Sequence, residues 1–172
     1  STASDRRLVA LIGYLRNTTD FGLSYERERK LQRPVKPATV TYSDADLAGC
    51  ERTGRSTSGW VTQVADENNE HTTSSVDCAA RRQDAAAKSS TDSEVTAASD
   101  SSTRSGLPVN AVMEAQYGEG EVRHFHRMDN DAGRLAILNG ASPALRYLAR
   151  HQKVSLSFMR DAFSPELHTD SR

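Results

Sequence analysis

The sequence has few of the residues that build a large hydrophobic core or a cysteine-based site. Aromatic residues make up 6% of its 172 residues, hydrophobic residues make up 36%, and there is a single Trp. The two cysteines are too few and too isolated for a disulfide framework or a metal site, which favours an intracellular, reducing compartment. No apolar run approaches the length of a membrane-spanning helix, so we expect no membrane span. A chain this poor in apolar side chains is expected to be marginally stable or supported by a partner.

The sequence also has no large excess of positive or negative residues, because its net charge is −1. It is unevenly spread, with +3 in residues 1–60, −6 in residues 61–120 and +2 in residues 121–172. A strong nucleic-acid binder usually has a basic domain, which this balance does not give. The one dense basic stretch, residues 27–36, is interpreted as a solvated linker bounded by Pro34 and Pro37. Contact with the phosphates of a nucleic acid is the alternative.

The pattern of apolar residues predicts an α/β domain with a mixed sheet. We expect strands at residues 22–27, 38–43, 59–65, 72–78 and 122–128, and helices at 5–16, 91–103 and 131–139. The Gly106-Leu107-Pro108 sequence is expected to break the helix before it. The Ser/Thr-biased residues 89–106 are also compatible with a loop or partial disorder. Residues 145–163 fit either a helix or a strand.

Three carboxylates stand where expected elements begin or end. Asp44 follows the strand at 38–43, Glu94 follows a Ser/Thr run suited to a helix N-cap, and Asp129 follows the strand at 122–128. Acids that converge from two strands and a helix are what a two-metal phosphodiester hydrolase requires. Mg²⁺ is a hard cation that takes oxygen ligands. Isolated acids are, however, mostly ordinary surface residues, so the residues alone leave both interpretations open.

Five segments, taken in order, resemble one known family. Residues 42–49 (YSDADLAG) with 55–61, residues 80–94 and residues 129–137 are similar to successive landmarks of the ribonuclease H domain in copia-type retrotransposon polyproteins. Residues 12–25 resemble the segment that links the reverse transcriptase to that domain. Residues 149–161 resemble the helix before its last strand. No single motif is specific, but the five together cover nearly the whole chain.

The resemblance implies a fold and an activity. The fold is α/β, an RNase H-like mixed sheet with flanking helices, and residues 145–163 are then helical. Residues 1–37 are the connection-like helix, strand and basic linker, and residues 38–172 are the RNase H-like domain. The activity is Mg²⁺-dependent hydrolysis of the RNA strand of RNA–DNA hybrids. Its catalytic metal ligands are Asp44, Glu94 and Asp129, with two Mg²⁺ ions and a metal-activated water as nucleophile.

The chain also departs from the family pattern. The family has a final strand and a fourth acid, whereas this chain stops about where that strand should form, and Asp170 comes too early to replace the acid. The last strand and terminal helix are therefore expected to be incomplete, and the activity weak or absent. Residues 62–78 and 95–105 are more polar than the family pattern. These departures favour an alternative, a co-opted non-catalytic scaffold or interaction subunit that binds protein partners through residues 145–163 or through Leu8, Leu11, Ile12 and Leu15.

The other candidate side chains are expected to be solvent-exposed or to pack in the core. His124 and His126 are expected to be exposed strand residues, because no third metal ligand is suggested. Trp60 and Tyr42 are expected to pack in the core beside the first strand, with stacking on bases as the alternative. Asp46 and Asp131 are expected to be exposed or to lie outside the ligand set.

Overall fold

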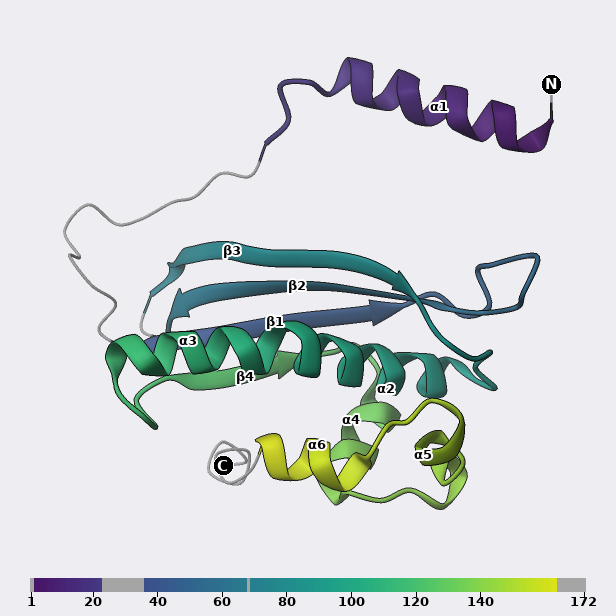
Figure 1. Cartoon of the computed structure of the whole chain (residues 1–172). Helices are drawn as coiled ribbons and strands as arrows, with labels where there is room; N and C mark the ends of the chain where they lie inside the picture. Colours follow the sequence, from purple (N-terminus) through teal and green to yellow (C-terminus); the bar gives the residue numbers. More distant parts are fainter. Residues whose placement is uncertain (1, 23–35, 68, 164–172) are drawn as a thin grey trace.

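The computed structural model describes residues 2–22, 36–67 and 69–163 (Figure 1). A mixed four-stranded sheet has the strand order β3-β2-β1-β4, with β1–β2 and β2–β3 antiparallel and β1–β4 parallel. The expected α/β fold class is confirmed, and this mixed sheet with flanking helices is compatible with an RNase H-like fold. The elements are, in order, α1 (Ala3–Asn17), β1 (Pro37–Ala45), β2 (Thr57–Asp66), β3 (Asn69–Arg82), α2 (Ser90–Ser101), the π-helical turn η1 (Ser102–Gly106), α3 (Leu107–Tyr117), β4 (Arg123–Arg127), α4 (Asp131–Asn139), the 3₁₀ turn η2 (Pro143–Leu145), α5 (Leu148–His151) and α6 (Leu156–Phe163).

The helices α2 and α3 run along one face of the sheet (Figure 1). They are joined through the π-helical turn η1, so the break expected at Gly106-Leu107-Pro108 is wrong. Pro108 lies in the first turn of α3, where a missing backbone N–H is tolerated. A Cβ atom on Gly106 would lie 2.6 Å from both Thr41 Oγ1 and His124 Nε2, so glycine allows the turn to touch the sheet.

The helix expected at 91–103 is confirmed by α2 and η1, and the Ser/Thr-rich segment is largely buried, so the alternative of a loop or partial disorder at 89–106 is wrong. Some of its hydroxyl groups donate to backbone carbonyls one helical turn earlier. Thr96 donates to Asp92 O at 2.9 Å, and Ser102 donates to Ala98 O at 2.6 Å. Ser and Thr usually weaken a helix because their hydroxyl groups compete for backbone partners. Here the hydroxyls share carbonyls that the helix also uses, and packing against the sheet keeps the segment helical.

The sheet face beneath these helices is polar, and hydrogen bonds hold it to them. Gln83 Nε2 donates to Ser58 Oγ at 3.1 Å and to Ser93 O at 2.8 Å. Ser105 Oγ in η1 donates to Thr62 Oγ1 at 2.7 Å. The buried strand side chains on this face include Thr39, Thr41, Ser43, Ser58 and Thr62.

The hydrophobic core lies to one side, between α2, α4 and the helices that follow. The expected helical character of 145–163 is confirmed by η2, α5 and α6, although they are three short pieces. The helix expected at 131–139 coincides with α4. The core residues are Val95, Ala98, Ala136, Ile137, Leu145, Leu148, Val154, Leu156, Met159 and Phe163.

The hairpin of β2 and β3 is longer than the two strands expected at 59–65 and 72–78. None of the described side chains of the edge strand β3 is buried, as the polar residues there predict. Trp60 is buried and donates Nε1–H to Asp77 Oδ2 at 3.0 Å, so its expected packing role is confirmed. Tyr42 is 43% exposed, and the expectation that it packs in the core is wrong.

The N-terminal helix is present, with a capping box between Thr2 and Asp5. It contains no buried residue. The strand expected at 22–27 falls almost wholly outside the described residues. Within the described part of the chain, no helix is long and apolar enough to cross a membrane.

Candidate metal centre

Strand register places two of the three acids side by side. The parallel pair β1 and β4 aligns Tyr42 with Arg127. Asp44 and Asp129 each come two residues later, so they lie at the same height where the two strands end. Because parallel strands end at a common edge, both carboxylates reach one side of the sheet.

The third acid comes from helix α2. Ser89 caps this helix by accepting from Asp92 N at 3.2 Å, and Glu94 follows in the next turn. The backbone N–H of Ala45 donates to Asp44 Oδ1 at 2.9 Å and to Glu94 Oε1 at 3.3 Å. One peptide group at the end of β1 therefore orients two of the carboxylates.

The three carboxylates converge as predicted. One oxygen from each of Asp44, Glu94 and Asp129 lies within 4.8 Å of the others. Asp44 and Asp129 are exposed, whereas Glu94 is 6% exposed. The cluster is thus open to solvent on the side of the two aspartates and closed behind the glutamate.

The electrostatics of Glu94 favour a positive charge beside it. Burial, with added repulsion from Asp44 and Asp129, raises the pKa of Glu94 from 4.5 to about 7, and the Ala45 N–H opposes the shift. Its Oε2 atom is buried without a hydrogen-bond partner among the described residues. Carboxylate oxygens suit Mg²⁺ or Mn²⁺, so the donor set and the unpaired oxygen both fit a divalent cation. Asp170, the poor substitute for a fourth acid, lies outside the described residues.

Sequence reasoning missed Asn130, which fixes the turn after Asp129. Its Oδ1 atom accepts from Gly133 N at 2.8 Å, capping α4, and from Thr91 Oγ1 at 3.4 Å. The second bond ties this turn to the start of α2. Asn directly before a helical pattern is an N-cap signal that could have been read from sequence, but the contact with Thr91 could not.

Asp92 is a second residue that was missed. It is fully buried, and its Oδ2 accepts from Lys88 N at 2.8 Å and from Tyr147 Oη–H at 3.0 Å. Burial, together with the hydrogen bond to Asp92 and its charge, raises the pKa of Tyr147 to about 12. Asp92 therefore anchors the beginning of the helix that carries Glu94.

The remaining acids near the centre behave as expected. Asp46 is exposed and accepts a hydrogen bond from the backbone N–H of Thr57, which holds the loop after β1. Asp131 is exposed and pairs with Arg134 at 3.2 Å. Neither belongs to the cluster of three.

The two histidines of β4 are not exposed strand residues, which corrects that expectation. They face the helices, where His126 Nε2 lies 2.9 Å from Ser43 Oγ and His124 Nε2 lies 3.2 Å from Thr41 Oγ1. Burial lowers the pKa of His124 to about 4, and burial with the neighbouring His124 lowers that of His126 to about 3. Both rings are therefore neutral at pH 7, and they belong to the polar layer beneath the helices.

Comparisons with protein-family models, with curated proteins and with solved structures found no match to this chain.

Proposed function

We propose that this chain is an RNase H-like domain, related to those of copia-type retrotransposons, that hydrolyses the RNA strand of RNA–DNA hybrids with a divalent cation. The observation that carries the proposal is the convergence of Asp44, Glu94 and Asp129 within 4.8 Å. The ordered motifs 42–49, 80–94 and 129–137 support it. So does a sheet in which β4 returns parallel to β1.

The three side chains have different positions and so different roles. The exposed Asp44 and Asp129 face the side from which a phosphodiester could approach, and the buried Glu94 lies behind them. When bound, divalent cations supply Lewis-acid stabilisation of the attacking and leaving oxygens and lower the pKa of a bound water. The Ala45 N–H holds Asp44 and Glu94 in place before any cation arrives, which reduces the reorganisation needed on binding.

We expect the activity of the chain to be weak. Two cations about 4 Å apart need more carboxylate oxygens than three side chains comfortably supply. Within the described residues, no fourth acid joins the cluster. The near-neutral charge of the whole chain adds little general attraction for a nucleic acid.

The test is cleavage of a labelled RNA–DNA hybrid by the full chain in Mg²⁺ or Mn²⁺. Wild-type protein is expected to cut the RNA strand slowly, and Asp129→Asn to lower the rate by about 100-fold or more. Asp131→Asn, two residues away and outside the cluster, is the matched control and should keep the wild-type rate. Cleavage that survives in Asp129→Asn, or wild-type protein that cuts no faster than buffer, would contradict the proposal.

A second candidate is the non-catalytic interaction subunit. The specific observation in its favour is the apolar side of α1, where Leu8, Leu11, Ile12 and Leu15 are all more than half exposed. A partner protein that covers this helix would supply hydrophobic burial that the chain lacks. This candidate predicts metal binding without hybrid cleavage, and a partner whose binding is lost in Leu11→Asp.

A further inference from the structure

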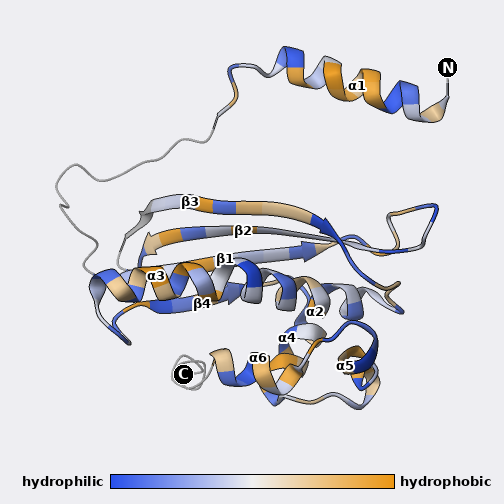
Figure 2. Ribbon diagram, viewed as in Figure 1, coloured by the Kyte–Doolittle hydropathy of each residue, from blue (hydrophilic) through white to orange (hydrophobic). Residues whose placement is uncertain are grey.

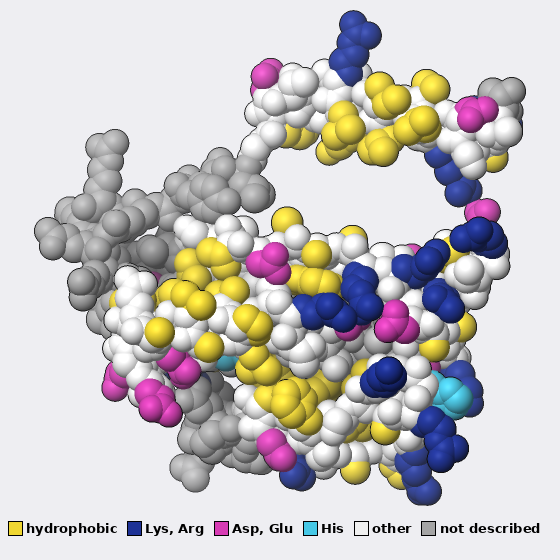
Figure 3. Space-filling view, in the orientation of Figure 1, with side chains coloured by type: hydrophobic (Ala, Val, Ile, Leu, Met, Phe, Trp, Pro, Cys, Tyr) yellow, Lys and Arg dark blue, Asp and Glu magenta, His cyan; other side chains and the backbone are white. Residues whose placement is uncertain are grey.

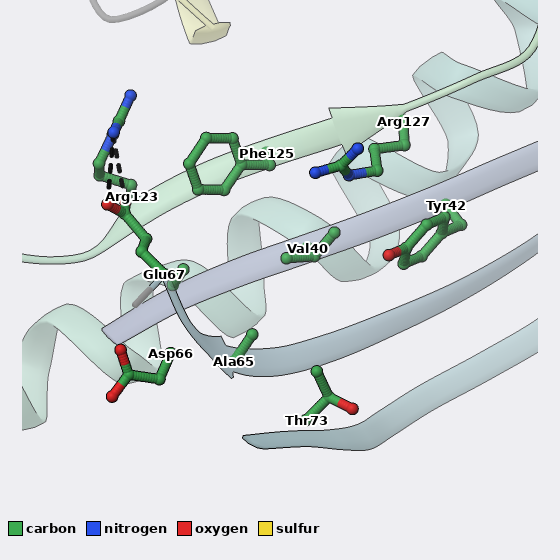
Figure 4. A pocket seen from close by; sticks show the side chains of 10 residues that line it. Val40, Tyr42, Ala65, Asp66, Glu67, Thr73, Arg123, Phe125 and Arg127 are labelled. Carbon is green, nitrogen blue, oxygen red and sulfur yellow. Dashed lines mark hydrogen bonds and ion pairs between the residues drawn. The ribbon is translucent and has the colours of Figure 1, made fainter. Parts of the chain in front are cut away.

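The face of the sheet turned away from α2 and α3 is more apolar than the face they cover. Strand register places Val40 next to Phe125 on this open face, with Tyr42 following along β1 (Figure 4). These residues line an open cleft of about 580 Å³ together with Ala38 and Ala65. Trp60 lies on the covered face, but Val40, Tyr42 and Phe125 are turned toward the face on which no helix of the described residues packs.

Charged residues mark the two ends of this cleft. At the end where β1 begins lie Asp66, Glu67 and Arg123, and at the other end lies Arg127 (Figure 4). Arg123 pairs with Glu67 at 3.3 Å, and its guanidinium lies 4.9 Å from the centre of the Phe125 ring. The cleft therefore has an acidic component at one end and a basic residue at the other.

The helix α1 has an apolar side that is not buried against any other described element. Its apolar residues recur at the spacing of one helix face, and the ribbon of α1 is hydrophobic along most of its middle in Figure 2, with hydrophobic side chains gathered along it in Figure 3. An isolated helix of about 15 residues is marginal in water, because most helix stability in proteins comes from packing. In the structure α1 stands apart from the sheet, and it pairs with the body through exposed Arg7 and Glu51 at 3.0 Å (Figure 1).

We propose that α1 docks within the same chain into the cleft on the open sheet face. Its apolar side, Leu8, Leu11, Ile12 and Leu15, then covers Tyr42 and Phe125, which are exposed and half-buried, above Val40, which is already buried. This is a contact between two surfaces of one molecule, and it does not depend on the metal centre.

The charges along one flank of α1 favour one orientation, with Arg7 on the other flank paired with Glu51. Asp5 and Arg16 are about three helical turns apart, so they lie on the same flank of the apolar side, separated by about 16 Å along the axis. With α1 antiparallel to β1, Arg16 approaches Asp66 and Glu67, and Asp5 approaches Arg127. The reverse orientation would bring Arg16 next to Arg127.

Chain length permits this docking in cis. Residues 18–36 connect α1 to β1, and a segment of that length can span up to about 60 Å. A tethered helix has an effective concentration on the order of millimolar, well above a micromolar second copy. The occupant of the cleft is therefore the chain's own helix.

Amide hydrogen exchange of the full chain tests the proposal. Amides in α1 are expected to exchange at least about 100-fold more slowly than in an unstructured peptide, at both 10 and 1 micromolar protein. Leu11→Asp on the helix and Tyr42→Asp in the cleft should each return α1 to peptide rates. Val112→Asp is the control, because Val112 is 71% exposed on α3, and it should leave α1 unchanged.

Protection of α2 in every variant shows that the domain is folded and keeps each result interpretable. Peptide-like exchange of α1 in the wild-type chain would overturn the proposal. So would α1 protection that survives Tyr42→Asp. Protection that is lost on tenfold dilution would assign the cleft to a second copy and overturn docking in cis.

Discussion

Lowering the pH from 7 to about 4 is expected to destabilise the protein by several kcal/mol, mainly through His124 and His126. Their pKa values are lowered in the folded state to about 4 and about 3, whereas an unfolded histidine has its ordinary value of 6.5. The unfolded chain therefore binds protons first. The stability that the neutral rings contribute is fully present above pH 6.5 and is lost as the pH falls toward the folded values.

The hydrogen bonds of His126 explain why its neutral form is required. Ser102 Oγ gives its proton to Ala98 O at 2.6 Å, so it accepts from His126 Nδ1–H at 3.1 Å. This assignment leaves Nε2 to accept from Ser43 Oγ at 2.9 Å. A second proton on the ring would turn that acceptor into a donor facing Ser43.

Urea unfolding of the metal-free protein at pH 7, 5.5 and 4 measures this loss. The variant His126→Gln, which keeps an acceptor and a donor, is expected to lose less stability between pH 7 and pH 4 than the wild type. His151→Gln is the control, because His151 is exposed, and it should follow the wild-type curve. Equal losses in wild type and His126→Gln would show that other groups cause the acid sensitivity.

Replacing Glu94 with Gln is expected to have opposite effects with and without metal. The folded-state pKa of Glu94 is raised to about 7, so its favourable contribution is present below pH 4.5 and is lost as the pH rises through 7. At pH 8 the metal-free wild type must hold a buried carboxylate beside two others. Glu94→Gln removes this repulsion and should raise the unfolding midpoint at pH 8, with no difference remaining below pH 4.5.

Mn²⁺ should make the wild type more stable than Glu94→Gln at pH 8, which reverses the order of their unfolding midpoints. A cation present at about 100 times its dissociation constant stabilises the wild type by about 2.7 kcal/mol, because it binds only the folded state. The variant Glu94→Gln should gain far less, since it has lost one of three anionic ligands. Thermal unfolding at pH 8 with and without Mn²⁺ measures both effects, and Glu119→Gln on an exposed turn is the control. A wild-type midpoint that Mn²⁺ does not move would argue against the site.

The cluster of Asp44, Glu94 and Asp129 could be predicted because its residues lie where strands end and a helix begins. Asp44 lies near the end of β1 and Asp129 just after β4, and parallel strands bring such positions together regardless of how the core packs. Glu94 required only a helix with a recognisable cap at Ser89. The resemblance supplied the order of the three segments, and local signals supplied the boundaries of α4.

The helix break and the buried faces could not be predicted, because tertiary contacts decide both. Gly106 and Pro108 would weaken a solvent-exposed helix, but here the glycine fits against Thr41 and His124 and the helix continues. Strand alternation shows which residues share a face but not which face is covered. Hydrophobicity would bury Tyr42, yet the helices cover the face of Thr41.

Diffraction from crystals soaked in Mn²⁺, collected at the manganese absorption edge, tests the central claim most directly. The proposed function predicts anomalous density between Asp44, Glu94 and Asp129, at about 2.2 Å from their carboxylate oxygens. A second peak about 4 Å from the first would complete the two-metal arrangement. Both peaks should vanish in Asp129→Asn crystals treated in the same way. Wild-type crystals with manganese elsewhere but no density between these three carboxylates would contradict the claim.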